Sequence, residues 1–339
     1  MPDAGCPKPI LMRLDRLLTL YFFHPLRKIL GQKGGPRISI LMYHSISNQD
    51  DPGRHPYFQT NTKPEIFARQ MQFLADNDYK VISLTDAVSL LSIVLQPAAG
   101  SPTPDTLPLR GMPESGSRKP EAGSPKPHKY CVLTFDDGYR DFYAVAWPIL
   151  KKYGFTATMF LPTGFISNER KRLNGRDCLT WDEVVTLAGE GAAFGAHTVS
   201  HVQLYKTYTA ATEQPNSSFP RRPESIDELT PFEYELRASK LAIEEALGKP
   251  ADHYSYAYAF PEHDEKFVGF YDKSLREAGY QGAVTTRIGT VMPDDNLYCL
   301  KRLPVNSYDD VELLQAKIEG GYDWLNRIQV MKKSIKFAG

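Results

Sequence analysis

The stretch Tyr130-Cys131-Val132-Leu133-Thr134-Phe135-Asp136-Asp137-Gly138 joins an apolar run to two adjacent carboxylates and a glycine. Residues 130–135 have the length and composition of a buried strand. Gly138 permits a tight turn, because glycine adopts backbone angles that other residues avoid. The sequence therefore predicts that a buried strand ends at the two carboxylates.

The same alternation of apolar strands and amphipathic helices runs along most of the chain. Thr-x-x-Glu capping boxes are expected to begin three of the helices, at Thr62, Thr180 and Thr230. Strands separated by helices pair in parallel, and about seven such repeats favour a closed or nearly closed β/α barrel over a doubly wound open sheet. No glycine-rich phosphate-binding signature follows the first strand. The predicted strands cover residues 38–43, 130–135, 157–161, 192–196, 254–260 and 282–286. The predicted helices cover residues 64–77, 142–153, 231–247 and 267–278, and two more are predicted to begin at 181 and near 309.

Composition sets further limits on the kind of protein. The 339 residues hold 40 Lys and Arg against 40 Asp and Glu, so the formal net charge is zero. Nucleic-acid-binding proteins usually carry a basic surplus, which argues against that class. The four cysteines form no C-x-x-C pair, so we expect buried or incidental thiols in a reducing compartment.

A proline-rich composition marks residues 97–128 as an insert. These 32 residues contain eight prolines and almost no large apolar side chains. Such a segment cannot bury enough surface to offset the entropy of ordering it, so we expect it to be disordered or extended. The length of the chain allows two domains, but we expect one barrel at 37–306, an N-terminal amphipathic segment at 1–36 and a C-terminal helical extension at 307–339.

The N-terminal segment combines leucines and aromatic residues with arginines. No run reaches the ~18–20 apolar residues of a spanning helix, and no signal-peptide cleavage site follows. We expect a short helix that ends before Pro25. Two interpretations stay open: the helix docks on the barrel, or it lies at a membrane interface with Arg13, Arg16, Arg27 and Lys28 near the headgroups. The expected location is the cytoplasm, with peripheral contact at the inner membrane face as an option.

Three predicted strand ends carry polar side chains, and functional groups gather at the carboxyl ends of barrel strands. Asp136 and Asp137 are adjacent, and two like charges at one strand end cost free energy unless a cation such as a metal ion compensates them. The alternative to a metal site is a turn in which an aspartate caps the next helix. His197 and His201 are spaced i and i+4, which suits chelation by two imidazoles. His44 follows the strand at 38–43 and is a candidate general acid, against a structural histidine as the alternative.

Asp137, His197 and His201 together offer one oxygen and two nitrogen ligands. Three protein ligands that leave one position for water are the usual arrangement of a catalytic zinc site. A metal bound in this way polarises a carbonyl group and acidifies its water.

The motifs Thr134-Phe135-Asp136-Asp137-Gly138 and His197-Thr198-Val199-Ser200-His201 together resemble the first two motifs of the polysaccharide deacetylases, the NodB-like carbohydrate esterase family 4. The similarity extends over residues 38–306. The resemblance implies a distorted (β/α)7 barrel that removes N- or O-acetyl groups from sugars. Tyr43-His44 resembles a circularly permuted subgroup, in which the catalytic histidine stands on an N-terminal strand.

The family resemblance also implies roles for individual residues. Asp136 would be the general base that activates the attacking water. Asp137, His197 and His201 would bind a divalent metal, commonly Zn2+, with Ni2+, Co2+ or Fe2+ as alternatives. The backbone N–H of Glu262 would stabilise the oxyanion.

The sequence departs from the family pattern at three points. Glu262-His263 follows Pro261, where family members usually have an aromatic residue and glycine. The family arginine that precedes this proline is absent, so Arg302 is the candidate to orient Asp136, against a surface ion pair as the alternative. No histidine follows His263, so either His44 or His263 would be the general acid.

The resulting expectation is a metal-dependent hydrolase that removes N-acetyl groups from an acetamido sugar in a polysaccharide or glycoconjugate. Hydrolysis of a non-sugar linear amide on the same fold and an inactive glycan-binding relative are the alternatives. The acetylated carbohydrate is the expected partner, whether a polymer, an oligosaccharide or a lipid-linked sugar.

Overall fold

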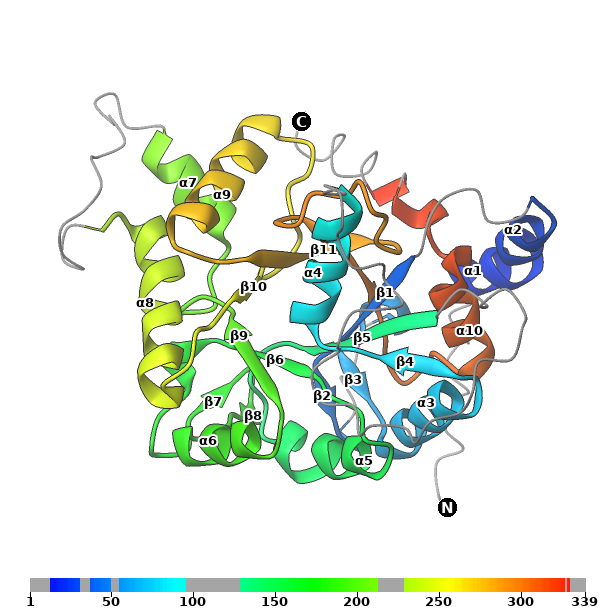
Figure 1. The fold of residues 1–339 in the computed structure, drawn as a ribbon, viewed down its shortest axis with the longest axis horizontal. Coiled ribbons are helices and arrows are strands. Elements are labelled where there is room, and N and C mark those ends of the chain that lie inside the picture. Colours follow the sequence, from blue (N-terminus) through cyan, green and yellow to red (C-terminus); the bar gives the residue numbers. More distant parts are fainter. Residues whose placement is uncertain are drawn as a thin grey trace, which may run out of the picture.

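Seven parallel strands form a closed ring in this computed structural model, which describes residues 13–30, 37–49, 55–95, 129–212, 229–326 and 328–329. Around the ring, β1 pairs with β12 on one side and with β5 on the other, so no edge stays open. The ring confirms the distorted (β/α)7 barrel and excludes the open sheet (Figure 1). Its strands are β1 (Ile38–Tyr43), β12 (Leu300–Pro304), β11 (Gly282–Ile288), β10 (His253–Ser255), β9 (Ala193–Ala196), β6 (Thr158–Leu161) and β5 (Lys129–Phe135).

Helices surround the barrel (Figure 1), as expected for parallel strands that are buried on both faces. A short strand, β4 (Tyr79–Val81), pairs with the beginning of β5, while β6 pairs with its end. The helices are α3 (Pro64–Asp76), α4 (Leu84–Leu95), α5 (Trp147–Lys152), α6 (Trp181–Gly189), α7 (Leu204–Thr212), α8 (Pro231–Leu247), α9 (Glu265–Glu277) and α10 (Val311–Ala316). Short elements at the barrel rim are β2 (Ser45–Ile46), β3 (Asn61–Thr62), η4 (Thr163–Phe165) and the hairpin of β7 (Arg172–Leu173) and β8 (Arg176–Asp177).

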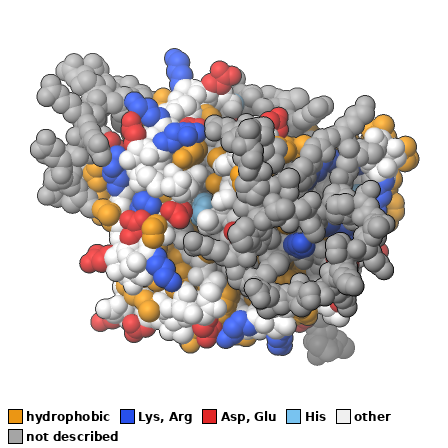
Figure 2. Space-filling view, in the orientation of Figure 1, with side chains coloured by type: hydrophobic (Ala, Val, Ile, Leu, Met, Phe, Trp, Pro, Cys, Tyr) orange, Lys and Arg blue, Asp and Glu red, His pale blue; other side chains and the backbone are white. Residues whose placement is uncertain are grey.

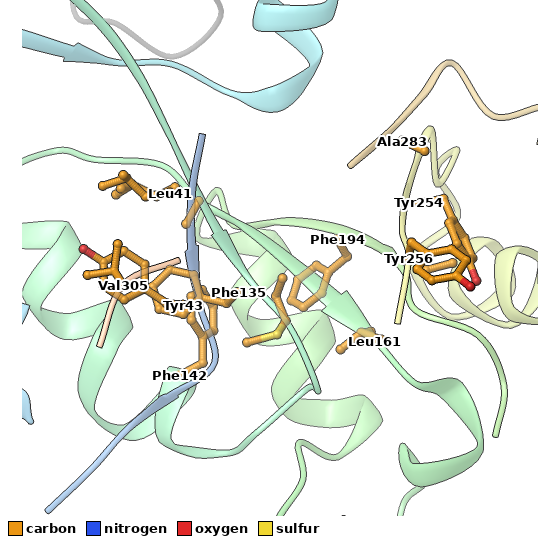
Figure 3. Close-up of a cluster of buried hydrophobic side chains, with 14 of the residues drawn as sticks. Leu41, Tyr43, Phe135, Phe142, Leu161, Phe194, Tyr254, Tyr256, Ala283 and Val305 are labelled. Carbon is orange, nitrogen blue, oxygen red and sulfur yellow. The ribbon is translucent and has the colours of Figure 1, made fainter. Parts of the chain in front are cut away.

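Alternation along the strands separates the outer core from the barrel interior. Tyr43 and Phe135 lie opposite each other in the β1–β5 register, their rings stack 5.3 Å apart, and the Tyr43 hydroxyl donates to Gln70 on α3 (Figure 3). These side chains therefore face the outer helices. Successive strand residues point to opposite faces, so Thr134 and Asp136 point into the barrel.

A second apolar cluster fills the other end of the barrel. It joins side chains of β1, β5, β6, β11 and β12 to the inner face of α4, including Leu84 and Leu91. The polar groups lie at the end where the strands finish: Asp136 and Asp137 follow β5, and His197 follows β9. Three cysteines are buried free thiols, as the sequence predicts: Cys131, Cys178 and Cys299. Cys6 lies outside the described residues.

Two of the three predicted capping boxes are confirmed. Thr180 and Thr230 each exchange hydrogen bonds with the glutamate three residues later, at the starts of α6 and α8. The box predicted at Thr62 is wrong, because Thr62 belongs to β3 and its hydroxyl donates to the carbonyl of Val305. Lys63 is the N-cap residue of α3 and makes no side-chain cap there.

The strand predicted at 254–260 is correct only at its beginning. β10 ends at Ser255, and Tyr258 has a φ of 66°, a left-handed conformation that a strand does not allow. The alternating aromatic side chains pack against a helix instead: the Tyr256 and Phe260 rings lie 5.0 Å apart, and Phe260 contacts Tyr271 of α9.

The N-terminal segment is helical from Leu14 to Leu30 and does not end before Pro25. It consists of α1 (Leu14–Leu18), the π-helical turn η1 (Thr19–Phe23) and α2 (His24–Leu30). Pro25 is the second residue of α2 and lacks a backbone N–H. It follows the π-turn η1, where the regular hydrogen-bond pattern of the helix is already interrupted.

This segment docks on the barrel beside α10 and the turn η6 (Lys317–Gly321). Phe23 stacks on Trp324, with ring centroids 4.6 Å apart. Of the two interpretations, docking is the one that the structure shows, because the four cations pair with acidic residues of the C-terminal extension. The pairs are Arg13 with Asp309, Arg16 with Asp310, Arg27 with Asp323 and Lys28 with Glu319. The predicted insert at 97–128 lies outside the described residues.

Candidate active site

Asp136 and Arg302 form a buried, bidentate ion pair inside the barrel. Both guanidinium nitrogens, Nη1 and Nη2, lie 2.8 Å from a carboxylate oxygen of Asp136. Arg302 is fully buried, so the alternative of a surface ion pair is wrong. The Arg302 side chain is itself fixed by the carbonyl of Thr285 and the hydroxyls of Thr134 and Ser255.

The surroundings of Asp136 keep its carboxylate ionised. Burial would raise its pKa, but the charges of Arg302 and His197 and the hydrogen bonds from Arg302 lower it below the ordinary value. Ser255 Oγ lies 3.1 Å from Asp136 Oδ1. An ionised carboxylate held in one orientation is suited to accept a proton.

Asp137, His197 and His201 gather as the sequence predicts. Each offers one potential ligand atom, and these three atoms all lie within 4.8 Å of one another. Asp137 Oδ1 lies 3.4 Å from His197 Nε2 and 3.0 Å from His201 Nε2. Asp137 has a φ of 72° and Gly138 a φ of 62°, which is the tight turn expected after β5. That turn sends Asp137 toward β9 while Asp136 faces Arg302.

The other ring nitrogens of both histidines are occupied. His197 Nδ1 lies 2.8 Å from the carbonyl of Ser255, and His201 Nδ1 lies 3.2 Å from the hydroxyl of Tyr258. Metal-ligating histidines commonly make such a hydrogen bond through the nitrogen that does not bind the metal. Both Nε2 atoms are thereby turned to Asp137, and the set of one oxygen and two nitrogens fits a divalent transition metal.

The two candidate acids occupy different places. His44 follows β1 beside Asp136, whose backbone N–H donates to the carbonyl of Tyr43 at 3.0 Å. Burial lowers the pKa of His44, while Asp137 and Asp136 act to raise it. His263 lies in the loop between β10 and α9, edge-on to the ring of Tyr205 at 6.3 Å. The geometry thus brings His44 to the carboxylates.

The loop after β10 carries the candidate oxyanion group. Glu262 has a buried side chain whose carboxylate accepts a hydrogen bond from Arg287 at 2.8 Å. The backbone of the loop is held by Thr286, which accepts from Phe260 N–H and donates to the carbonyl of Tyr258. The ion pair between Glu262 and Arg287 anchors this loop to β11.

Sequence reasoning missed the groups that hold the site residues in place. Ser255 contacts Asp136, Arg302 and His197, and Tyr258 contacts His201. Glu235, from the second turn of α8, contacts the turn between the two histidines. The spacing of residues along the chain carries no sign of these contacts, because each depends on packing between distant elements.

Comparison with known proteins agrees with this geometry. The family model described as polysaccharide deacetylase matches residues 123–283. The Bacillus subtilis (strain 168) protein YxkH, which is named as a polysaccharide deacetylase, is 27% identical over 271 residues, covering 80% of this chain and 72% of that protein.

Solved structures of other proteins share the fold. The Streptococcus pyogenes deacetylase PplD, solved in complex with acetate, is 23% identical, with a TM-score of 0.56 over 84% of this chain and 99% of PplD. IcaB from Ammonifex degensii is 18% identical, with a TM-score of 0.56 over 85% of this chain and 99% of IcaB. The chain is therefore similar in sequence to polysaccharide deacetylases, with the family match at residues 123–283.

Proposed function

We propose that this protein is a metal-dependent hydrolase that removes N-acetyl groups from an acetamido sugar. The observation that carries the proposal is the convergence of Asp137, His197 and His201 beside an ionised, oriented Asp136. One group of residues can hold a cation, and the neighbouring carboxylate can accept a proton. Together, a bound cation and a proton acceptor can hydrolyse an unactivated amide through attack by water.

Asp137, His197 and His201 would hold the divalent metal, which supplies polarisation of the acetyl carbonyl and a lowered pKa of water. Asp136 accepts the proton of the attacking water, and Arg302 keeps its carboxylate oriented for that transfer. The backbone N–H of Glu262 donates to the oxyanion of the tetrahedral intermediate. His44 donates a proton to the leaving amine, so acetate and a free amino sugar are released. Zn2+ is the metal we propose, with Ni2+, Co2+ and Fe2+ as the alternatives.

The test is acetate release from a panel of substrates by the purified chain, with and without a chelator. Acetylated polymers, oligosaccharides and lipid-linked sugars should be compared with O-acetylated sugars by the same assay. Non-sugar amides such as ureides and formamides release no acetate, so their turnover is followed by loss of the substrate. Chelator-sensitive acetate release with an amino-sugar product supports the proposal. Turnover of only the non-sugar amides would assign that reaction instead, and a metal-free chain without any turnover would favour a glycan-binding role.

We also propose that the N-terminal segment contacts a lipid surface through its apolar face. None of the helices in the described ranges is long and apolar enough to cross a bilayer. Because the cations of the segment pair with the C-terminal extension, its outward side chains are mainly hydrophobic: Tyr21 is 77% exposed, Phe22 57% and Ile29 82%. Figure 2 shows hydrophobic side chains at the right edge of the molecule, where Figure 1 draws α1 and α2. Apolar faces of this kind insert into the headgroup region.

Flotation with phosphatidylcholine vesicles, with and without phosphatidylglycerol, tests this contact. The wild-type protein should float with both kinds of vesicle, and a Tyr21→Ser, Ile29→Ser variant should stay in solution. Equal flotation of the variant, or a wild-type chain that instead elutes as a dimer without binding vesicles, would reject it. This contact would place the protein at the inner face of the membrane, within the cytoplasm.

A further inference from the structure

The turn that joins the two histidine ligands is in a strained conformation. Thr198 has a φ of 68° and His201 a φ of 53°. Both are left-handed conformations that residues other than glycine adopt rarely, and for the β-branched Thr198 such a φ is a true outlier. Backbone of this kind persists only where its surroundings fix it, and it gathers at functional sites.

Glu235 of α8 holds the N–H groups of this turn from one side. Its Oε2 accepts hydrogen bonds from the backbone N–H of Val199 at 2.7 Å and of Ser200 at 3.0 Å. Its Oε1 accepts from the hydroxyl of Ser200 at 2.5 Å. Hydrogen bonds to an ionised acceptor are among the strongest in proteins, and Glu235 is 7% exposed, so water competes little for them.

The rim turn η4 holds the carbonyl groups of the same residues from the other side. The backbone N–H of Thr163 donates to the carbonyl of Thr198 at 3.1 Å, and that of Gly164 donates to the carbonyl of Val199 at 2.8 Å. A side chain at Gly164 would meet the Val199 carbonyl oxygen at 2.7 Å. The close approach leaves the turn no room to move toward η4.

We propose that Glu235 is a positioning residue for the metal centre: it fixes the strained turn so that both imidazoles point at Asp137. This inference rests on the proposed metal-dependent function but adds a residue outside the two motifs, contributed by a separate helix. Without the carboxylate, two backbone N–H groups lose their acceptor and the turn can relax toward ordinary backbone angles. That relaxation would separate His197 from His201 and weaken the site before any chemistry takes place.

The helix offers a matched control two residues away. Glu233 caps the start of α8 by accepting from the backbone N–H of Thr230, and its side chain makes its cap contacts there rather than at the turn. Glu233→Ala should therefore destabilise α8 without disturbing the histidines. Glu235→Ala removes all three hydrogen bonds to the turn, whereas Glu235→Gln keeps one oxygen acceptor and is the milder variant.

The experiment is titration of the metal-free full chain with Co2+, followed by its visible absorption and by competition with a chelator. We expect Glu235→Ala to bind Co2+ about 10-fold to 100-fold more weakly than the wild-type chain, the size of effect known for groups that orient metal ligands. Glu235→Gln should fall between them. Glu233→Ala should keep the wild-type affinity and spectrum although it lowers the melting temperature.

Two results would overturn the inference: folded Glu235→Ala and Glu235→Gln variants that bind Co2+ like the wild-type chain, or a Glu233→Ala variant that loses affinity equally. If Glu235→Ala does not fold, the Gln variant decides. A wild-type chain that binds no metal at all would refute the proposed function itself, which is a different outcome.

Discussion

Replacing Arg302 by methionine tests the ion pair at the centre of the site. The guanidinium and the Asp136 carboxylate are both buried, and they are joined by two hydrogen bonds of 2.8 Å. Removing one partner of a buried pair leaves the other as an uncompensated charge, which costs about 3–5 kcal/mol. Arg302→Met should therefore lower the free energy of unfolding by that amount.

Urea unfolding followed by circular dichroism measures this loss. The double variant Arg302→Met, Asp136→Asn should regain at least about 2 kcal/mol, because neither buried charge is then left without its partner. Recovery should be incomplete, since the carbonyl of Thr285 loses its donor. Arg172→Met is the control: Arg172 pairs with Asp177 at the surface, and such pairs contribute less than about 1 kcal/mol.

The same variant should change the pH dependence of activity. Without the guanidinium, burial raises the pKa of Asp136, so the acid limb of kcat/KM should move to higher pH. A loss of stability below about 1 kcal/mol, or a double variant no more stable than Arg302→Met, would refute the electrostatic reasoning. An unmoved acid limb would show that Asp136 is not the group that must be ionised.

Three further outcomes are expected. Asp136→Asn should lower turnover by about 100-fold or more while Co2+ still binds, since general-base catalysis contributes factors of this size; near-normal turnover would remove Asp136 from that role. His44→Ala should cost more activity than His263→Ala in the same acetate assay, and the reverse order would transfer the acid to His263. Burial lowers the pKa of His253 from 6.5 to about 4. Because the unfolded state takes up the proton first, the free energy of unfolding should fall by about 3 kcal/mol as the pH drops through that range. Urea titrations at several pH values should show that a His253→Gln variant lacks this part of the loss of stability.

The sequence predicts the barrel and the residues that face its mouth for simple reasons. The strand at 38–43, apart from Ser39, and most of β5 are apolar runs, and a buried parallel strand produces that pattern. Asp136, Asp137 and His44 stand at the ends of those runs, so their neighbourhood follows from the parallel arrangement alone. The pair His197 and His201 is readable because both ligands come from one short segment.

What the sequence does not reveal depends on contacts between distant elements. Arg302 lies 166 residues from Asp136 along the chain, and its burial follows from the closure of the ring. Glu235 and Ser255 look like ordinary residues of a helix and a strand. At Tyr258 a local pattern misleads, because alternating aromatic residues are typical of a strand, whereas the chain there turns to face His201.

Closure of the ring by β1, between β5 and β12, has a consequence for how the protein is made. During synthesis the first strand and the carboxylates leave the ribosome long before the arginine that neutralises one of them. Until β12 follows, Asp136 has no counter-ion and β1 lacks one neighbour, so the nascent chain exposes strand edges that invite aggregation. A chain halted before residue 302 lacks the arginine that orients Asp136, so the ion pair at the centre of the site forms only after translation has passed this point.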